Sequence, residues 1–234
     1  MVRVAAASLD AVSKLYGGFA ALRKVSVEFA VGSSTVVLGD NGAGKSTMLR
    51  LIAGLIAPTR GTVQVFAEEP RWQHRRIAYM SHEAMLYDEL SAMENLRYFA
   101  ELQREDGGCV CGAAERTLRA VGLDPALTRP VGQYSQGMRQ RASLARVLQT
   151  DPELLLLDEP FSNLDVDSAR HMVELLMEFR SWPVSTTSSE QGIRGRTIIL
   201  TTHQAHLAEP LAETTLTMRA GAILSIAGAT GVLQ

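Results

Sequence analysis

The sequence predicts an α/β fold whose core sheet is mainly parallel. Two short apolar runs, residues 154–157 and 197–201, have the length and composition of strands that are buried on both faces of a parallel sheet. An amphipathic segment around residues 172–179 lies between them, with apolar residues at helical spacing. A further strand, residues 34–38, leads through a glycine-rich loop into a helix. Strands that alternate with helices are typical of α/β proteins.

The composition indicates a globular chain and argues against a dedicated nucleic-acid binder. Lysines and arginines number 23 against 25 aspartates and glutamates, which gives a formal net charge of −2. Hydrophobic residues make up 46% and charged residues 21%, which excludes disordered and fibrous proteins. We therefore expect the 234 residues to form one domain, residues 1–234.

Neither a membrane span nor a disulfide framework is expected. No apolar run approaches the ~20 residues of a membrane helix, and the apolar stretch near the N-terminus is too short for a signal peptide. Cys109 and Cys111 are the only cysteines, and we interpret them as reduced thiols in a loop. These features predict a protein that remains in the cytoplasm.

The other elements follow from local patterns. Residues 25–30 are expected to form a strand just before the strand at 34–38. The helix after the glycine-rich loop is expected to carry apolar residues from Met48 to Leu55. Ser91 and Glu94 form a capping-box pattern, which predicts that a helix begins there.

The order of these elements predicts a core interrupted by helices. An α/β core of residues 1–81 and 150–234 is expected to enclose a helical insert of residues 82–149. The polar segment 183–195 is rich in serine, threonine and glycine, so we expect a surface loop there.

The glycine-rich loop matches the pattern G-x-x-x-x-G-K-[ST] in full, after a buried strand and before a helix. Its glycines allow backbone N–H groups to surround phosphates, and the helix N-terminus adds partial positive charge. Lys45 is expected to neutralise phosphate oxygens and Ser46 to bind Mg²⁺. Asp40 is expected to point outward. The expected nucleotide-binding residues of the loop are Gly39, Asp40, Asn41, Gly42, Ala43, Gly44, Lys45, Ser46 and Thr47.

Two acidic residues end the four-leucine strand. Asp158 is expected beside the phosphate loop, where its carboxylate can hold Mg²⁺. Glu159 follows and is the candidate general base for attack of water on the γ-phosphate. The simpler alternative is a pair of exposed acidic residues at a strand end.

The segment from Tyr134 to Arg141 resembles the signature motif of the ATP-binding-cassette (ABC) ATPases. This resemblance implies a phosphate-loop NTPase fold with an N-terminal antiparallel β part and an inserted helical subdomain. It also implies ATP and Mg²⁺ as ligands, and a dimer of ATPase subunits. In that dimer Ser135, Gln136 and Gly137 of one subunit would contact ATP held by the other.

Further motifs follow the order of the same family. Tyr16 lies where the family has an aromatic residue that stacks on adenine. The segment 162–165 resembles the dimer-contact loop. His203 resembles the switch histidine, which donates to the γ-phosphate, so we count it with Glu159 and Lys45 among the catalytic residues. An ordinary half-buried tyrosine and a strand-end histidine are the alternatives.

The chain departs from the family pattern at several positions. His82 stands where most members carry a glutamine that contacts Mg²⁺, and an imidazole can still bind or hydrogen-bond. Gln136 and Asn163 replace glycines in the signature motif and the dimer-contact loop. None of these changes removes a phosphate ligand.

The resemblance also implies that this chain acts together with separate polytopic membrane subunits and lies at the cytoplasmic face of the inner membrane. The region from His82 to Leu96, with the signature segment, is similar to small exporter ATPases, notably the haem-exporter subunits of cytochrome c maturation. Drug and polysaccharide exporters share much of this pattern. A soluble ABC ATPase that moves no solute is the remaining alternative, whereas a phosphate-loop kinase would lack the signature motif.

The docking site of a membrane subunit is expected in the loop after His82. Met85, Leu86 and Tyr87 are apolar for a solvent-exposed loop. Their side chains are expected to contact the partner, so that Leu86→Asp would weaken assembly without destabilising the chain. The alternative is that they pack internally against the helix that begins at Ser91.

Overall fold

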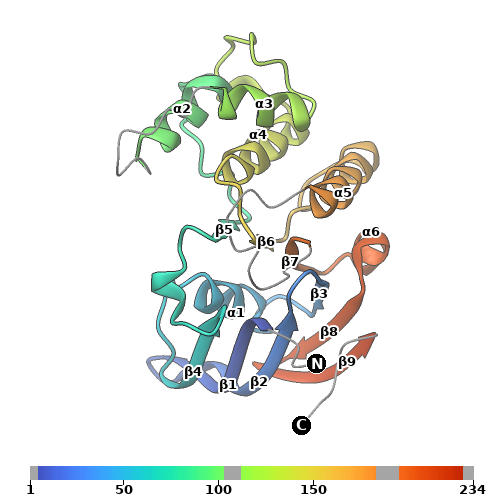
Figure 1. Cartoon of the computed structure of the whole chain (residues 1–234). Helices are drawn as coiled ribbons and strands as arrows, with labels where there is room; N and C mark the ends of the chain where they lie inside the picture. The colour runs from blue at the N-terminus through green and yellow to red at the C-terminus, as the bar shows by residue number, and fades with distance from the viewer. Residues whose placement is uncertain (1–4, 103–111, 183–194, 229–234) are drawn as a thin grey trace.

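The computed structural model describes residues 5–102, 112–182 and 195–228. It confirms the predicted α/β fold, with a mainly parallel core sheet and an antiparallel part near the N-terminus. Figure 1 shows the antiparallel sheet at one end of the molecule and helices from the middle of the chain at the other. Cys109, Cys111 and residues 183–194 lie outside the described residues.

The core sheet has six strands. In spatial order they are β5 (Ile77–Met80), β6 (Leu154–Asp158), β7 (Thr197–Thr202), β3 (Ser34–Leu38), β8 (Thr214–Arg219) and β9 (Ala222–Gly228). The first five are parallel, and only the edge strand β9 runs antiparallel to its neighbour. The two apolar runs therefore form neighbouring inner strands, and the four leucines of β6 are fully buried. Because these strands are parallel, their carboxyl ends lie along one edge of the sheet.

The smaller sheet covers one face of this core. Its order is β2 (Phe19–Ala30), β1 (Ala5–Tyr16) and β4 (Arg60–Val65), all antiparallel. Helix α1 (Lys45–Ile52) lies between the two sheets and buries Met48, Leu49, Leu51 and Ile52 against apolar residues of both. The helix is therefore packed on two sides.

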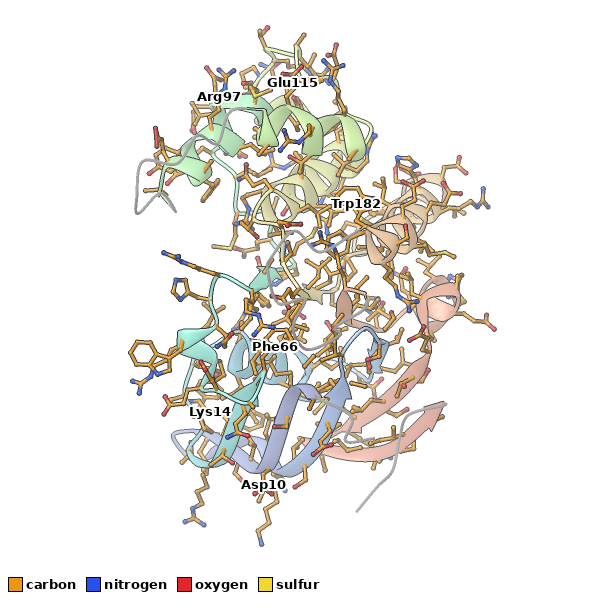
Figure 2. All side chains as sticks on the ribbon, in the orientation of Figure 1. Asp10, Lys14, Phe66, Arg97, Glu115 and Trp182 are labelled. Atoms are coloured by element: carbon orange, nitrogen blue, oxygen red, sulfur yellow. The ribbon has the colours of Figure 1, made fainter. Side chains whose placement is uncertain are left out.

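The opposite face of the core sheet packs against the remaining long helices in a second apolar cluster. Helices α2 (Ala92–Leu102), α3 (Ala113–Ala120) and α4 (Gln136–Leu148) contact one another. Helix α5 (Val166–Ser181) buries the predicted apolar face, and Trp182, labelled in Figure 2, packs edge-on against Phe179. The short helix α6 (Ala205–Ala208) follows β7. Among the described residues, Pro70–Trp72, Val131–Gln133 and Glu209–Leu211 form 3₁₀ segments.

Element boundaries match the local patterns with two exceptions. The capping box is confirmed, since the Glu94 amide donates to Ser91 Oγ at 3.2 Å and the Ser91 amide donates to Glu94 Oε2 at 2.8 Å. The helix expected to reach Leu55 is shorter: Gly54 adopts φ +73°, which ends α1 and leaves Leu55 exposed. Strand β2 begins at Phe19, earlier than expected, because it pairs along most of β1. In the described part of the chain, no helix is long and apolar enough to cross a bilayer.

Candidate functional site

The glycine-rich loop joins the end of β3 to the start of α1, and two of its glycines are required by close packing. Gly39 has φ +156°, and a Cβ there would lie 2.4 Å from the Met218 carbonyl oxygen. Gly44 has φ +102°, and a Cβ there would lie 2.6 Å from the Ala21 carbonyl oxygen. No L side chain fits at either position without moving the backbone. The loop is thereby held against β8 and β2, with α1 beginning at Lys45.

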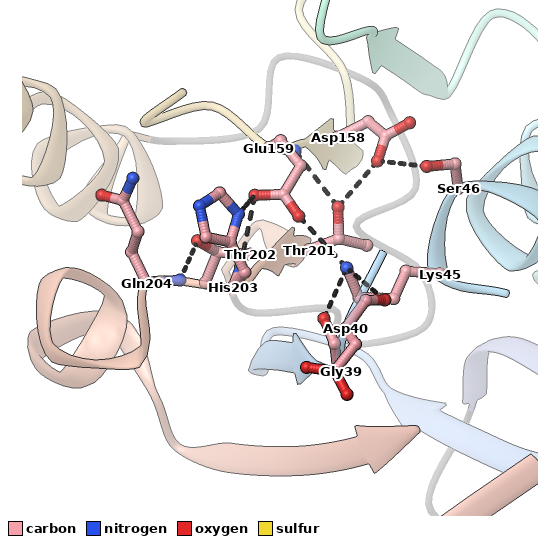
Figure 3. A network of polar contacts seen from close by, with 10 residues as sticks. All are labelled: Gly39, Asp40, Lys45, Ser46, Asp158, Glu159, Thr201, Thr202, His203 and Gln204. Carbon is pink, nitrogen blue, oxygen red and sulfur yellow. Dashed lines mark hydrogen bonds and ion pairs between the residues drawn. The ribbon is translucent and has the colours of Figure 1, made fainter. Parts of the chain in front are cut away.

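Lys45 places a buried ammonium in this loop. Its Nζ donates to the carbonyl oxygens of Gly39 at 2.7 Å and Asp40 at 3.3 Å (Figure 3). The same Nζ lies 3.2 Å from Glu159 Oε1, in an ion pair with little exposure. Within the described chain this Oε1 is buried and accepts no hydrogen bond, so its contact with the Lys45 ammonium is an ion pair. Lys45 therefore has Glu159 and two loop carbonyls as partners, and a phosphate bound in the loop would compete with them for its three N–H donors.

Asp158, at the carboxyl end of β6, receives three hydroxyl groups. Its Oδ1 accepts from Ser46 Oγ at 2.9 Å and from Thr201 Oγ1 at 2.8 Å. Its Oδ2 accepts from the Tyr79 phenol at 3.1 Å. The Asp158 side chain is almost completely buried. These bonds fix the carboxylate beside the first turn of α1.

These donors fit a magnesium ion. The Ser46 hydroxyl and the Asp158 carboxylate offer oxygen ligands, which Mg²⁺ prefers. Mg²⁺ commonly completes its coordination shell with waters and substrate phosphates. No three histidine, cysteine, aspartate or glutamate side chains of the described residues converge as a preformed metal cage. His82 lines the same cavity, but its Nε2 lies 3.9 Å from Glu83, and no contact with Asp158 is seen in the described residues.

The Tyr79 phenol is perturbed by this environment. Burial of the ring, followed by the negative charge of Asp158, raises the pKa of Tyr79 to about 12 from its ordinary value of 10.0. A hydrogen bond with Arg50 on α1 opposes this shift. The phenol therefore stays protonated and donates to Asp158 over the physiological pH range.

Replacing Tyr79 by phenylalanine should reduce the loss of stability at alkaline pH. The unfolded chain releases the phenol proton near pH 10, while the folded protein keeps it to about pH 12. The raised pKa of Tyr79 therefore stabilises the folded protein below about pH 10, and this stabilisation is lost as the pH rises from about 10 to about 12. Urea unfolding at about pH 8 and about pH 11 should show a smaller decline for Tyr79→Phe than for wild type. Equal declines would contradict this assignment.

Glu159 and His203 lie at the neighbouring strand ends. Glu159 adopts φ +52°, in the left-handed region, directly after Asp158. Its Oε2 accepts from His203 Nδ1 at 3.0 Å and from the His203 amide at 3.3 Å. Because an ionised carboxylate only accepts, Nδ1 carries the proton in this contact. Figure 3 shows Glu159 between the Lys45 ammonium and the His203 ring.

A cavity of about 420 Å³ joins these groups. Tyr16, Asp40, Asn41, Gly42, Ala43, Gly44, Lys45, Ser46, Thr47, His82, Asp158, Glu159 and His203 line it, so most of the residues expected at the site lie together. Gly39 contributes through its carbonyl contact with Lys45. Phe19, Ala21 and Ser162 also line the cavity and were not expected. Phe19 pairs with Tyr16 across the β1–β2 hairpin, so its closeness to Tyr16 in the sequence could have indicated that it also lines the cavity.

The signature residues lie away from this cavity within one chain. Ser135 caps α4, with its Oγ accepting from the Met138 amide at 3.3 Å. Gln136 is exposed in the first turn, and Gly137 packs so closely that a Cβ would lie 2.5 Å from Ser168 Oγ of α5. Asn163 adopts φ +60°, a conformation that asparagine tolerates and glycine favours. This explains physically why asparagine can stand in the predicted dimer-contact loop.

Sequence comparisons place the chain among known proteins. A sequence profile described as "ABC transporter" matches residues 22–162, and one described as an AAA domain of a putative AbiEii toxin matches residues 117–209. The ABC transporter ATP-binding protein NatA of Bacillus subtilis is 32% identical over 209 residues, covering 87% of this chain and 80% of NatA. The phosphonates import ATP-binding protein PhnC of Thiobacillus denitrificans is 34% identical, covering 94% and 86%.

A fluoroquinolones export ATP-binding protein of Mycobacterium tuberculosis is 37% identical over 80% of this chain. The chain spans only 59% of that protein, and 51–60% of the sulfate/thiosulfate import ATP-binding proteins that it matches. Solved structures agree in fold. A dimeric ATP-binding cassette with ADP and Pi in a post-hydrolysis state has a TM-score of 0.79 at 24% identity, covering 97% of this chain and 100% of that one. The cbiO1 structure from Clostridium perfringens has a TM-score of 0.78 at 22% identity, covering 95% and 88%.

Proposed function

This chain belongs to the ABC transporter family and is an ATP hydrolase, and from that premise we propose that it drives solute export through separate membrane subunits. The observation that carries the site assignment is the position of Glu159. Its carboxylate lies 3.2 Å from the Lys45 ammonium and 3.0 Å from His203 Nδ1, at the mouth of the phosphate-binding loop. A base, a cation and a hydrogen-bond donor thus meet where the terminal phosphate of ATP would lie.

The proposed binding step exchanges one anion for another. Loop N–H groups and the Lys45 ammonium bind the β- and γ-phosphates, and Lys45 releases Glu159 as the phosphate takes its place. Tyr16, at the rim of the cavity, stacks on the adenine ring. Ser46 and Asp158 would hold Mg²⁺, which supplies charge neutralisation for the phosphates.

The proposed chemical step uses the released carboxylate. Glu159 orients a water molecule and takes its proton as the water oxygen bonds to the γ-phosphorus, while the bond from that phosphorus to the β–γ bridging oxygen breaks and ADP leaves. His203 gives up its contact with Glu159 and donates to the γ-phosphate oxygen, where negative charge develops. Both residues follow the carboxyl ends of neighbouring parallel strands, β6 and β7, which keeps them close to the loop after β3.

A complete site is proposed to need two subunits. Ser135 and the amides near Gly137 begin an exposed helix end that does not reach the cavity of its own chain. In a head-to-tail dimer this end would bind the γ-phosphate held by the opposite subunit. We further propose that residues 82–149 form the subdomain that carries this motif, on a core of residues 1–81 and 150–234.

The membrane subunit is proposed to dock on the loop before α2, with one correction to the expected contacts. Leu86 is half-buried and packs against the helical core, so the expectation that Leu86→Asp would spare stability is wrong. Met85 and Tyr87 are 57% and 45% exposed. Tyr87 also contacts the rings of Tyr98 and Phe99 on α2, which leaves Met85 as the cleanest probe.

Met85→Asp should weaken assembly and leave the isolated chain stable. Met85 has φ +47°, which aspartate tolerates better than most residues, so folding should change by less than about 0.5 kcal/mol. Loss of an apolar anchor should lower recovery with a membrane subunit at least about tenfold. Leu224→Asp, on the edge strand β9 and 57% exposed, is the matched control. Equal recovery of the Met85 variant and wild type from detergent-solubilised membranes would exclude this docking site.

The solute remains a separate proposal. The resemblance to haem-exporter ATPases favours haem export, while the 37% identity to a fluoroquinolones export protein favours a drug exporter. The peripheral position at the cytoplasmic face of a membrane follows from docking on such subunits. Release of phosphate from ATP by the purified chain, increased by reconstitution with a membrane subunit, tests the transport assignment. An ATPase that recovers no membrane subunit would favour the soluble, non-transport alternative.

A further inference from the structure

Thr201 connects the two acidic residues of the site. It is the next-to-last residue of β7 and lies opposite Asp158 in the parallel pairing of β6 and β7. Its side chain is fully buried and so does not line the cavity. Its Oγ1 lies 2.8 Å from Asp158 Oδ1 and 3.1 Å from the Glu159 amide nitrogen (Figure 3). One hydroxyl therefore contacts both the side chain of Asp158 and the main chain of Glu159.

The direction of these hydrogen bonds is fixed by chemistry. The Glu159 amide can only donate, so the Thr201 oxygen accepts from it. The single hydroxyl hydrogen is then directed to Asp158 Oδ1, which accepts. A side chain of similar shape without a hydroxyl removes both bonds.

The Glu159 main chain needs such support because its φ of +52° is unfavourable for a residue with a Cβ. The same amide also donates to the Thr201 main-chain oxygen at 3.1 Å. This turn directs the Glu159 side chain to Lys45 and His203, while Asp158 is directed to Ser46 and Tyr79. The Asp158 and Glu159 carboxylates therefore point to different partners, and Thr201 contacts the chain where their directions diverge.

We propose that Thr201 is a positioning residue for ATP hydrolysis. Its hydroxyl fixes the position of the Asp158 carboxylate relative to the Glu159 main chain. The inference rests on the proposed roles of these two residues. It assigns to Thr201 an effect on turnover and on the magnesium response rather than on nucleotide binding, because Thr201 itself does not line the cavity.

Thr201→Val tests the hydroxyl and Thr201→Ser restores it. For the valine variant, kcat should fall about 10–100-fold, as for other partners of metal-binding and reacting groups, while KM for ATP stays within about threefold. Binding of a fluorescent ATP analogue in EDTA should equal that of wild type, and its strengthening by added Mg²⁺ should be reduced. The serine variant should recover most of the kcat and of the magnesium response.

Thr197→Val is the matched control on the same strand. Thr197 is also buried, and its Oγ1 accepts from the Gly32 amide at 2.9 Å, at the end of β7 away from the cavity. This variant loses the bond from the Gly32 amide, one bond against the two lost in Thr201→Val, so its melting temperature should fall, but by less than that of Thr201→Val. Its kcat per folded molecule should stay at the wild-type value.

Three results would overturn the inference. Wild-type kcat and magnesium response in Thr201→Val would show that the hydroxyl positions nothing. Equal losses in the serine and valine variants would show that side-chain shape, rather than the hydroxyl, matters. An equal loss of kcat in Thr197→Val would show a general effect of destabilised β7. Failure of the proposed function is distinguishable, since Glu159→Gln would then hydrolyse ATP at the wild-type rate.

Discussion

Glu159→Gln should bind ATP and fail to hydrolyse it, with turnover reduced by at least about 10²-fold. The amide keeps the size of the carboxylate and one oxygen that can accept from His203, but it cannot take a proton from water. It also removes the negative charge 3.2 Å from the Lys45 ammonium, so ATP affinity should be equal to or higher than that of wild type. ATP should therefore hold the variant as a dimer, which is measured by size-exclusion mass with and without ATP.

Glu174→Gln is the control for this change. Glu174 lies exposed on α5, 3.6 Å from His171 and outside the cavity, so its substitution should leave turnover at the wild-type rate. Hydrolysis by Glu159→Gln at the wild-type rate would show that another group is the base.

Ser135→Arg should abolish ATP turnover and leave ATP binding by the dilute chain within a few-fold of wild type. In the proposed dimer, the substituted helix end of each subunit faces the ATP that the other subunit holds. Removal of a preorganised donor typically lowers the rate about 10²–10³-fold. The cavity of the same chain is not lined by Ser135, so nucleotide affinity measured on monomer should persist. For wild type, specific activity should rise with protein concentration until dimers predominate.

Loss of the cap on α4 needs its own control. Ser135 Oγ accepts from the Met138 amide, and removal of such a cap costs about 1 kcal/mol. Ser91→Ala removes the equivalent cap of α2, where the Glu94 amide donates to Ser91 Oγ, and it should lower stability without lowering turnover. A rate per subunit that is constant from dilute to concentrated wild-type protein would contradict the two-subunit site.

Much of the fold and site could be predicted because the signals are local. The loop around Lys45 and the acidic pair at the end of β6 are each recognised from a few consecutive residues. Thr201 and Tyr79 were missed because their contacts with Asp158 depend on the pairing of β5, β6 and β7, which brings together residues far apart in sequence. Leu86 shows a similar limit, since the orientation of a loop residue depends on packing that its type does not reveal.

The position of α1 between two sheets has a mechanical consequence. The helix buries four apolar side chains against strands on both sides, and its first turn carries the phosphate loop. A helix held on two sides resists displacement, because any shift opens voids in a closely packed interior. We therefore expect the loop to move little when nucleotide arrives or leaves. We expect ATP-driven movement to be carried instead by side chains that exchange partners and by segments packed on the opposite face of the core sheet.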